Sequence, residues 1–134
     1  MHTSSIVPLY LPKFLLMIIV SRRLVKVLSF NFASAMALFP FILLQKASLR
    51  ENHEMMNHER IHLRQQLELM ILFFYFIYLT EYSFGRIKGQ THYQAYKNIS
   101  FEKEAYENEH NLSYLKHRKF FSFYKYFLKQ TKKK

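Results

Sequence analysis

The run from about Glu54 to Phe84 constrains the fold most strongly, because it contains neither glycine nor proline. Most of its residues favour the α-helix, so the run predicts one long helix. Gly85 and Gly89 are the only glycines of the 134-residue chain, and they follow this run where a helix would end. The sequence therefore predicts a mainly α-helical fold.

The rest of the chain predicts shorter elements around this helix. A second helix is expected from about Thr91 or Ser100 to Lys116, with Ser100 as a candidate N-cap, and the segment "FFSFYKYFLKQ" favours another. The segment "ALFPFILLQK" combines apolar residues with a proline, which is typical of an extended or edge-strand segment. We expect this short β segment near residues 36–46.

Three apolar stretches indicate contact with a membrane. They cover Ile6 to Val20, Phe30 to Leu44 and Leu67 to Leu79, and each is shorter than the ~20 residues that a straight helix needs to cross a bilayer. The first stretch lacks the Lys or Arg that normally precedes the apolar part of a signal peptide, and its positive charges follow it instead. This pattern fits either a membrane-inserted or interfacial N-terminus, or a buried N-terminal helix.

The charge is strongly positive and unevenly distributed. The formal net charge is +11, and from Lys116 to the end of the chain there are eight Lys or Arg residues and no acid. A basic, aromatic tail suits an anionic partner, which we expect to be membrane lipid rather than nucleic acid. We therefore divide the chain into an apolar and basic N-terminal segment that associates with the membrane, a single HExxH domain and a basic tail, at residues 1–32, 33–128 and 129–134.

The motif "HERIH" runs from His58 to His62 within the predicted long helix. Two imidazoles four residues apart lie on one helical face, about 6 Å apart at Cβ, and can share one Zn²⁺. Glu59 follows the first histidine and is placed to take a proton from a metal-activated water. The alternative interpretation is a polar, histidine-bearing end of an apolar helix that binds no metal.

An upstream copy of the same pattern begins at His53 and ends in Asn57 instead of a second histidine. A side-chain amide is a poor zinc ligand beside imidazole, so this copy lacks one of the donors that a metal needs. We expect His53 and Glu54 to lie in the first turn of the helix or in the loop before it.

A zinc enzyme needs a third protein ligand, and the chain has no cysteine or aspartate to provide one. The expected acidic helix contains four of the nine acidic residues, Glu102, Glu104, Glu107 and Glu109. Glu102 is preferred, because the small Ala105 lies on its helical face and lets two helices approach closely. Glu104 is the alternative if the helix is rotated. We therefore expect the HERIH helix to pack against the helix that bears these glutamates.

HERIH and the later block Glu102-Lys103-Glu104-Ala105-Tyr106 together resemble the gluzincin arrangement of zinc metallopeptidases. In that family a Glu on a later helix joins the two histidines, and in membrane-bound members this helix often reads E-x-x-A-D or E-x-A-C-D. Glu102 and Ala105 match the pattern, whereas Tyr106 stands where the family places the Asp that helps to fix the geometry. The two blocks also resemble those of small uncharacterised bacterial HExxH proteins, over about residues 36–127.

The motif and the resemblance together predict a small membrane-associated zinc metallopeptidase, at the inner membrane of a bacterium. His58, His62 and Glu102 would bind Zn²⁺, Glu59 would act as the catalytic base, and the substrate would be a peptide or protein. Two alternatives stay open. One is a non-catalytic membrane protein that zinc stabilises, and the other is a basic amphipathic protein that binds membrane or nucleic acid.

Overall fold

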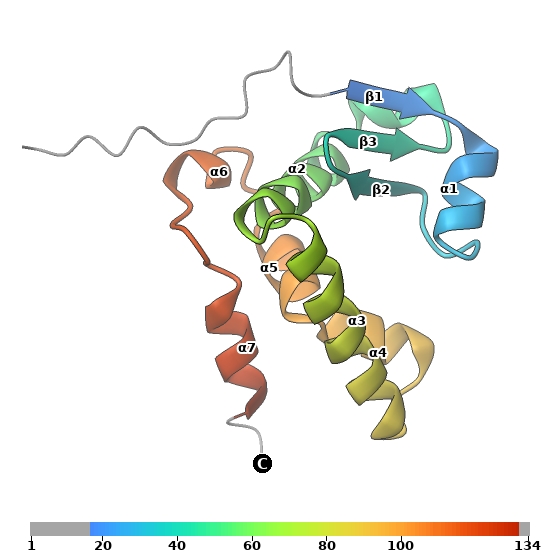
Figure 1. The fold of residues 1–134 in the computed structure, drawn as a ribbon. Coiled ribbons are helices and arrows are strands. Elements are labelled where there is room, and N and C mark those ends of the chain that lie inside the picture. Colours follow the sequence, from blue (N-terminus) through green and yellow to red (C-terminus); the bar gives the residue numbers. More distant parts are fainter. Residues whose placement is uncertain (1–16, 132–134) are drawn as a thin grey trace, which may run out of the picture.

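A computed structural model describes residues 17–131 of the protein, and it contains a small sheet at one end of a set of packed helices (Figure 1). In chain order the elements are β1 (Met17–Val20), α1 (Arg22–Leu28), β2 (Ala35–Leu38), β3 (Phe41–Leu44), the 3-10 helix η2 (Ala47–Glu51), α2 (His53–Glu68), α3 (Leu72–Ile87), α4 (His92–Asn98), α5 (Ser100–Asn108), α6 (Tyr114–His117) and α7 (Tyr124–Thr131). The predicted fold class, mainly α with a short β segment, is confirmed.

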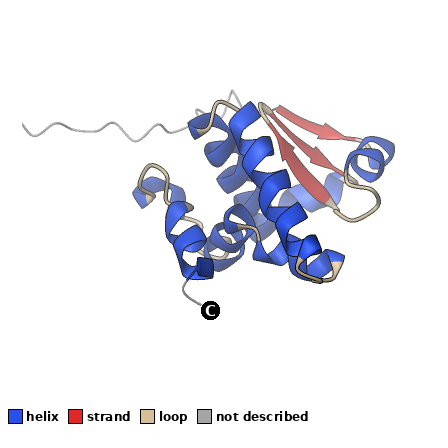
Figure 2. Ribbon diagram, turned by 60° about the horizontal axis from the view of Figure 1, so that its bottom comes forward, coloured by secondary structure: helices blue, strands red, loops and turns tan. Residues whose placement is uncertain are grey.

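The sheet has the strand order β1-β3-β2, with β3 parallel to β1 and antiparallel to β2. Strands β2 and β3 form a hairpin, and Pro40 lies in its two-residue turn rather than within a strand. The sheet flanks the helices on one side (Figure 2). Ile42 and Leu44 of the central strand are fully buried and pack with Met56 and Leu63 of α2. This contact leaves β2 as an edge strand beside the helix that carries HERIH.

The first apolar stretch ends in strand β1. Its register with β3 runs from Met17 opposite Phe41 to Val20 opposite Leu44. Helix α1 follows directly and buries Val25 completely. The expected N-terminal helix or membrane segment before residue 17 lies outside the described residues, as does the end of the basic tail after residue 131.

The expectation of one continuous helix over residues 54–84 is wrong. Helices α2 and α3 are separate and meet at an angle of 113°. At the break, Met70 and Ile71 have positive φ values of 53° and 63°, which are unfavourable for residues with a Cβ atom. The bend turns α3 back across α5, where Phe74 stacks on Phe101 with ring centroids 4.5 Å apart. Tertiary packing therefore sets this break, because no local glycine or proline favours it.

The expected second helix is likewise divided, at Ile99, into α4 and α5. Thr91 caps α4 and forms a capping box with Gln94. Ser100 is not an N-cap, which corrects the sequence prediction, because its hydroxyl donates to Glu81 Oε1 at 2.6 Å. The division lets α4 pack along α3 while α5 packs along α2.

Close packing between α3 and α4 makes Gly85 sensitive to substitution. A Cβ atom at this position would lie 2.7 Å from Gln90 Oε1 and 3.1 Å from Ala95 Cβ. Gly85→Val should therefore separate the two helices and lower the free energy of unfolding by about 2 kcal/mol, measured by urea denaturation. Ser83→Val, at an exposed position of the same helix, is the control. Equal losses in the two variants would contradict this explanation.

Candidate metal centre

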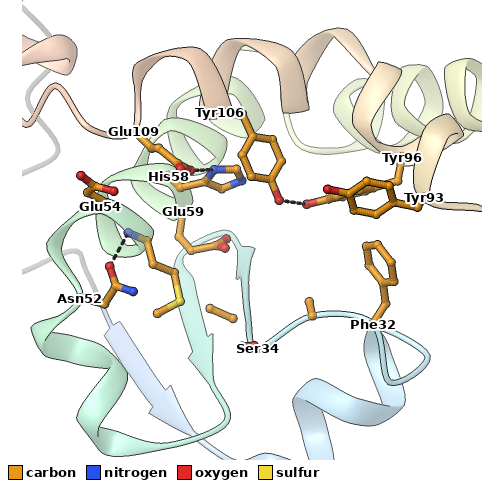
Figure 3. Close-up of a pocket in the computed structure, with 13 residues that line it drawn as sticks. Phe32, Ser34, Asn52, Glu54, His58, Glu59, Tyr93, Tyr96, Tyr106 and Glu109 are labelled. Carbon is orange, nitrogen blue, oxygen red and sulfur yellow. Dashed lines mark hydrogen bonds and ion pairs between the residues drawn. The ribbon is translucent and has the colours of Figure 1, made fainter.

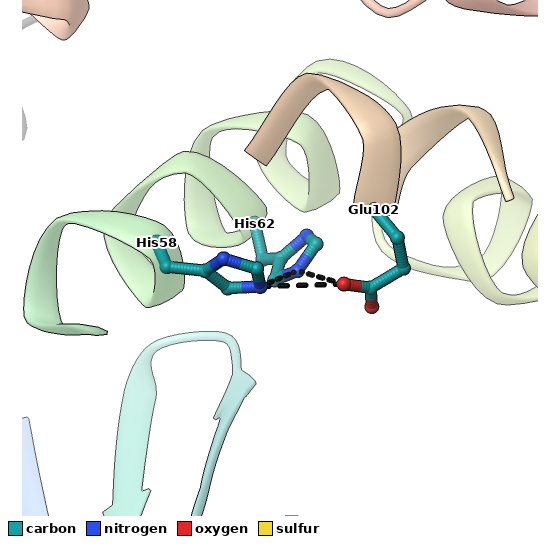
Figure 4. A group of neighbouring side chains, drawn as sticks. All are labelled: His58, His62 and Glu102. Atoms are coloured by element: carbon teal, nitrogen blue, oxygen red, sulfur yellow. Dashed lines mark hydrogen bonds and ion pairs between the residues drawn. The ribbon is translucent and has the colours of Figure 1, made fainter. Parts of the chain in front are cut away.

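Three side chains from two helices converge on one point (Figure 4). His58 and His62 lie one turn apart on α2, and Glu102 lies in the first turn of α5. The two Nε2 atoms are 3.0 Å apart, and they lie 3.2 Å and 3.3 Å from Glu102 Oε2 respectively. All three residues are buried. The structure therefore brings together the three residues that the sequence selected as metal ligands.

The triangle of ligand atoms has the dimensions of a zinc site. Zinc bonds of ~2.0–2.1 Å in a tetrahedron place the ligand atoms about 3.3 Å from one another. The observed separations of 3.0 to 3.3 Å are close to that value. Two imidazole nitrogens and a carboxylate oxygen also form a donor set that zinc accepts. The group could therefore hold a metal ion without a change in fold.

Close packing of α5 on α2 directs Glu102, rather than Glu104, toward the histidines. Ala105 follows Glu102 by three residues and is completely buried, as expected for a small residue where helices approach. Glu104 points elsewhere, and its Oε2 accepts a hydrogen bond of 2.9 Å from Gln65 Nε2. The alternative in which Glu104 joins the histidines does not match this geometry.

Each histidine is oriented by a hydrogen bond from its other ring nitrogen. His58 Nδ1 donates to Glu109 Oε2 at 2.7 Å, and His62 Nδ1 donates to Gln65 Oε1 at 2.8 Å. Donation from Nδ1 directs each Nε2 toward the shared point and makes it a better ligand. Glu109 thus fixes the orientation of the His58 ring. Tyr106 packs its ring on the same histidine, with centroids 4.5 Å apart.

These orienting residues were not predicted from the sequence, although the helical spacing of two of them could have indicated them. Gln65 follows His62 by three residues, and Glu109 shares the helical face of Glu102, so helical spacing could have indicated both. Tyr78 gave no such signal. Its hydroxyl donates to Glu102 Oε1 at 2.8 Å, which leaves Oε2 to face the histidines. This contact exists only because α3 turns back after α2.

A buried ion cluster extends the hydrogen-bonded network behind the metal centre. Gln65 connects His62 to Glu104, and Arg118 forms ion pairs with both Glu104 and Glu68. The side chains of this cluster are at most 1% exposed. Since Arg118 lies between α6 and α7, the network ties the C-terminal part of the chain to α2 and α5.

Glu59 lies beside the triangle, and one of its oxygens has no protein partner. Among the described residues nothing hydrogen-bonds to Glu59 Oε2, although the atom is buried. Burial raises the pKa of Glu59, while His62, His58 and the amide of Ala37 act in the opposite direction. A buried carboxylate with a raised pKa is a stronger proton acceptor than one in water. An unpaired buried acceptor of this kind is suited to accept a hydrogen bond, and then a proton, from a water molecule.

A cavity of about 450 Å³ opens beside His58 and Glu59. The Glu59 carboxylate points into it, and aromatic side chains form the opposite wall (Figure 3). That wall consists of Phe32, Tyr93, Tyr96 and Tyr106, and Glu54 and Glu109 line the other end. Ala35, the first residue of β2, also lines the cavity. A molecule bound there would contact both the candidate base and the edge strand.

The upstream copy of the motif has a structural role. His53 and Glu54 form the first turn of α2 after the N-cap Asn52, as expected. Asn57 is buried and donates through Nδ2 to the carbonyl oxygens of Glu109 and Asn111, at 2.8 Å and 3.0 Å. The amide therefore holds the end of α5 against α2, a contact for which a histidine ring has the wrong shape and donor number.

No family model matches the chain, and no curated protein or solved structure does either. Function therefore has to be inferred from the chemistry and geometry of the site.

A proton occupies the metal-free centre at neutral pH. Burial disfavours the charged form of His62, but the adjacent Glu102 carboxylate outweighs it and raises the pKa of His62 to about 9. Burial would raise the pKa of Glu102, yet the two histidines lower it well below its usual range. The pair is therefore an imidazolium and a carboxylate, and a metal ion has to displace the proton.

We expect zinc affinity to rise about tenfold per pH unit from neutral pH until the pKa of His62 is reached, and to level off above it. Isothermal titration calorimetry in buffers of different ionisation enthalpy should detect the released proton. The free energy of unfolding of the metal-free protein should instead fall as pH rises. Since the pKa of His62 is raised from 6.5 to about 9, its stabilisation is complete below pH 6.5 and is lost as pH rises toward 9. Zinc affinity that does not change over this range would contradict the protonated pair.

Loss of the hydrogen bond to His58 should weaken the centre without removing a ligand. Glu109→Gln is expected to lower zinc affinity about 10–100-fold, because the amide orients and polarises the imidazole less well. Glu107→Gln is the matched control on the same helix, since Glu107 is exposed. Competition with a chromophoric chelator measures both affinities. Equal affinities in the two variants would show that Glu109 does not support the metal.

Proposed function

We propose that this protein is a zinc-dependent metallopeptidase of the gluzincin type, in which His58, His62 and Glu102 bind the metal. One observation carries the proposal. The triangle of ligand atoms lies beside Glu59, a buried carboxylate with an unpaired oxygen that faces a cavity. A purely structural zinc site would need a fourth protein ligand, and no further His, Asp, Glu or Cys of the described chain joins this group.

The roles of the residues follow from their positions. When bound, zinc would polarise the scissile carbonyl and lower the pKa of a water in the position left open. Glu59 accepts the proton of the attacking water and then delivers it to the leaving amine. Glu109, Gln65 and Tyr78 hold the three ligands in place, so that little reorganisation accompanies the reaction.

Edge strand β2 supports a peptide as the substrate. Ser34 O accepts a hydrogen bond from Gln45 N, so Ser34 belongs to a hydrogen-bonded pair of the antiparallel ladder. By alternation, the backbone groups of Ala35 point away from β3, on the free side of the strand. Ala35 also lines the cavity. The next outward-facing residue, Ala37, is already bonded to Glu59 through its amide and to Gln66 through its carbonyl. An extended peptide could therefore pair with this edge at Ala35.

Two tyrosines on the cavity wall are suited to stabilise negative charge on the substrate. The hydroxyls of Tyr96 and Tyr106 are 3.0 Å apart and share a hydrogen bond. Burial raises the pKa of both phenols, so both remain protonated donors at neutral pH. Donation from one of them to the carbonyl oxygen of a peptide would favour the tetrahedral intermediate.

Glu59→Gln separates catalysis from metal binding. The amide cannot accept the proton of water, so the variant should keep its zinc and lose at least about a hundredfold in the rate of peptide hydrolysis. Zinc content is measured by elemental analysis, and hydrolysis with a mixture of quenched fluorescent peptides. If neither form hydrolyses peptides while both retain zinc, the site is structural and the proposal fails.

Single substitutions of the ligands test the metal assignment itself. His58→Ala, His62→Ala and Glu102→Gln should each lower bound zinc sharply, because two remaining protein ligands rarely retain it. His53→Ala is the matched control, since His53 is exposed at the start of the same helix. The same zinc content in all four variants would reject the centre.

A further inference from the structure

The outer face of α3 exposes a largely apolar surface. Its members are each between 57% and 82% exposed, and they are Leu72, Phe73, Phe76, Leu79, Phe84 and Ile87. On a helical projection they fall within one sector, or stripe, of α3, which also contains the exposed Thr80 and Ser83. A helix of 16 residues extends for about 24 Å. Exposed apolar surfaces of this extent mark sites of contact with another apolar phase.

Charge is distributed around this stripe in a specific way. The only acid of α3, Glu81, accepts hydrogen bonds from the backbone amide and hydroxyl of Ser100. Cations lie at the end of the helix, where Arg86 and Lys88 are exposed. The Lys88 ammonium lies over the Phe84 ring, 4.2 Å from its centroid. The outer face therefore combines aromatic and aliphatic side chains with positive charge at one end.

The opposite face of α3 is packed against the protein, where Phe74 stacks on Phe101 and two polar side chains bind α5. Tyr78 donates to Glu102, and Glu81 binds the start of α5. Within residues 17–131 no single helix reaches the length and hydropathy needed to cross a bilayer, and only the bent pair of α2 and α3 does so jointly. Since the protein covers the inner face of α3, only its outer face can meet another apolar phase, which fits a helix that lies along a membrane surface.

We propose that the outer face of α3 docks on the surface of an anionic bilayer, with the helix in the plane of the membrane. Leu72, Phe76 and Leu79 would enter the acyl boundary, while Arg86 and Lys88 contact lipid headgroups. Charge complementarity selects this occupant, because the protein carries a net charge of +11. A second copy would bring the same positive charge to the interface. The surface does not depend on the metal centre.

Flotation with lipid vesicles tests the surface. The full-length protein should bind vesicles that contain 30% phosphatidylglycerol better than pure phosphatidylcholine vesicles, and salt should weaken the difference. Phe76→Glu should lower the partition coefficient at least tenfold, because it places a charge within the stripe. Val27→Glu is the matched control, since Val27 is 71% exposed on α1. Unchanged melting temperature and zinc content would show that both variants are folded.

The cations are tested separately. Removal of both charges by Arg86→Gln and Lys88→Gln should reduce binding to the anionic vesicles by about tenfold or more, and leave the weak binding to neutral vesicles unchanged. An equal loss of binding to anionic and to neutral vesicles would show that Arg86 and Lys88 do not contact anionic headgroups.

Because the sequence contains no cysteine, single introduced cysteines can show which side of α3 enters the bilayer. Single cysteines at Phe76, Thr80 and Ser83 can each carry a polarity-sensitive fluorophore. On addition of anionic vesicles, all three probes should report an apolar environment. A probe at Arg60, which is exposed on α2, should remain in water.

Several results would overturn the proposal. Partition of the Phe76→Glu variant equal to that of the natural protein would remove α3 from the interface, as would an equal loss in Val27→Glu. A dimer that forms without vesicles and dissociates in Phe76→Glu would assign the stripe to a second copy. Preferential binding to duplex DNA, unaffected by Phe76→Glu, would assign the positive charge to nucleic acid.

Discussion

The buried polar face of α2 is the constraint on which the rest of the structure depends. Six polar side chains of this helix are at most 6% exposed, namely Asn57, His58, Glu59, His62, Gln65 and Gln66. A buried polar group without a partner is strongly destabilising, so each needs a hydrogen bond from another part of the chain. Gln66, for example, donates to Ala37 O of the sheet and accepts from the amide of Phe39. Glu59 Oε2 is the buried side-chain oxygen of α2 that has no partner within the described residues.

These partners explain how helices that are far apart in the sequence are assembled. Helix α5 provides Glu102 and Glu104, helix α3 provides Tyr78, and the segment before α7 provides Arg118. Arg118 is buried between two carboxylates, and removing one member of such a group leaves an uncompensated charge. The C-terminal segment therefore contributes to the geometry of the metal centre although it contacts none of its ligands. The same arrangement leaves the apolar outer side of α3 exposed.

Local patterns predicted the helical class, the short β segment and the three residues that converge at the site. The prediction succeeded for HERIH because residues four apart share a helical face in any α-helix. It succeeded for Glu102 because the donors available in the chain are few and a small residue follows on its face. It failed at the break between α2 and α3, where Met70 and Ile71 adopt a backbone conformation that their own propensities disfavour. Ser100 was misassigned for a related reason, since its partner Glu81 is on a helix whose direction depends on that break.

The sequence by itself determined which side chains could act as ligands and base, because spacing along one helix and the absence of Cys and Asp are properties of the chain alone. Tertiary structure decided what surrounds them. Tyr78 reaches Glu102, and the aromatic wall faces Glu59, only after α3 has turned through 113° and α5 has packed on α2. The physical reason is that periodicity reports which residues share a face, whereas the direction in which a helix leaves its predecessor is set by the contacts that lower the energy of the whole fold.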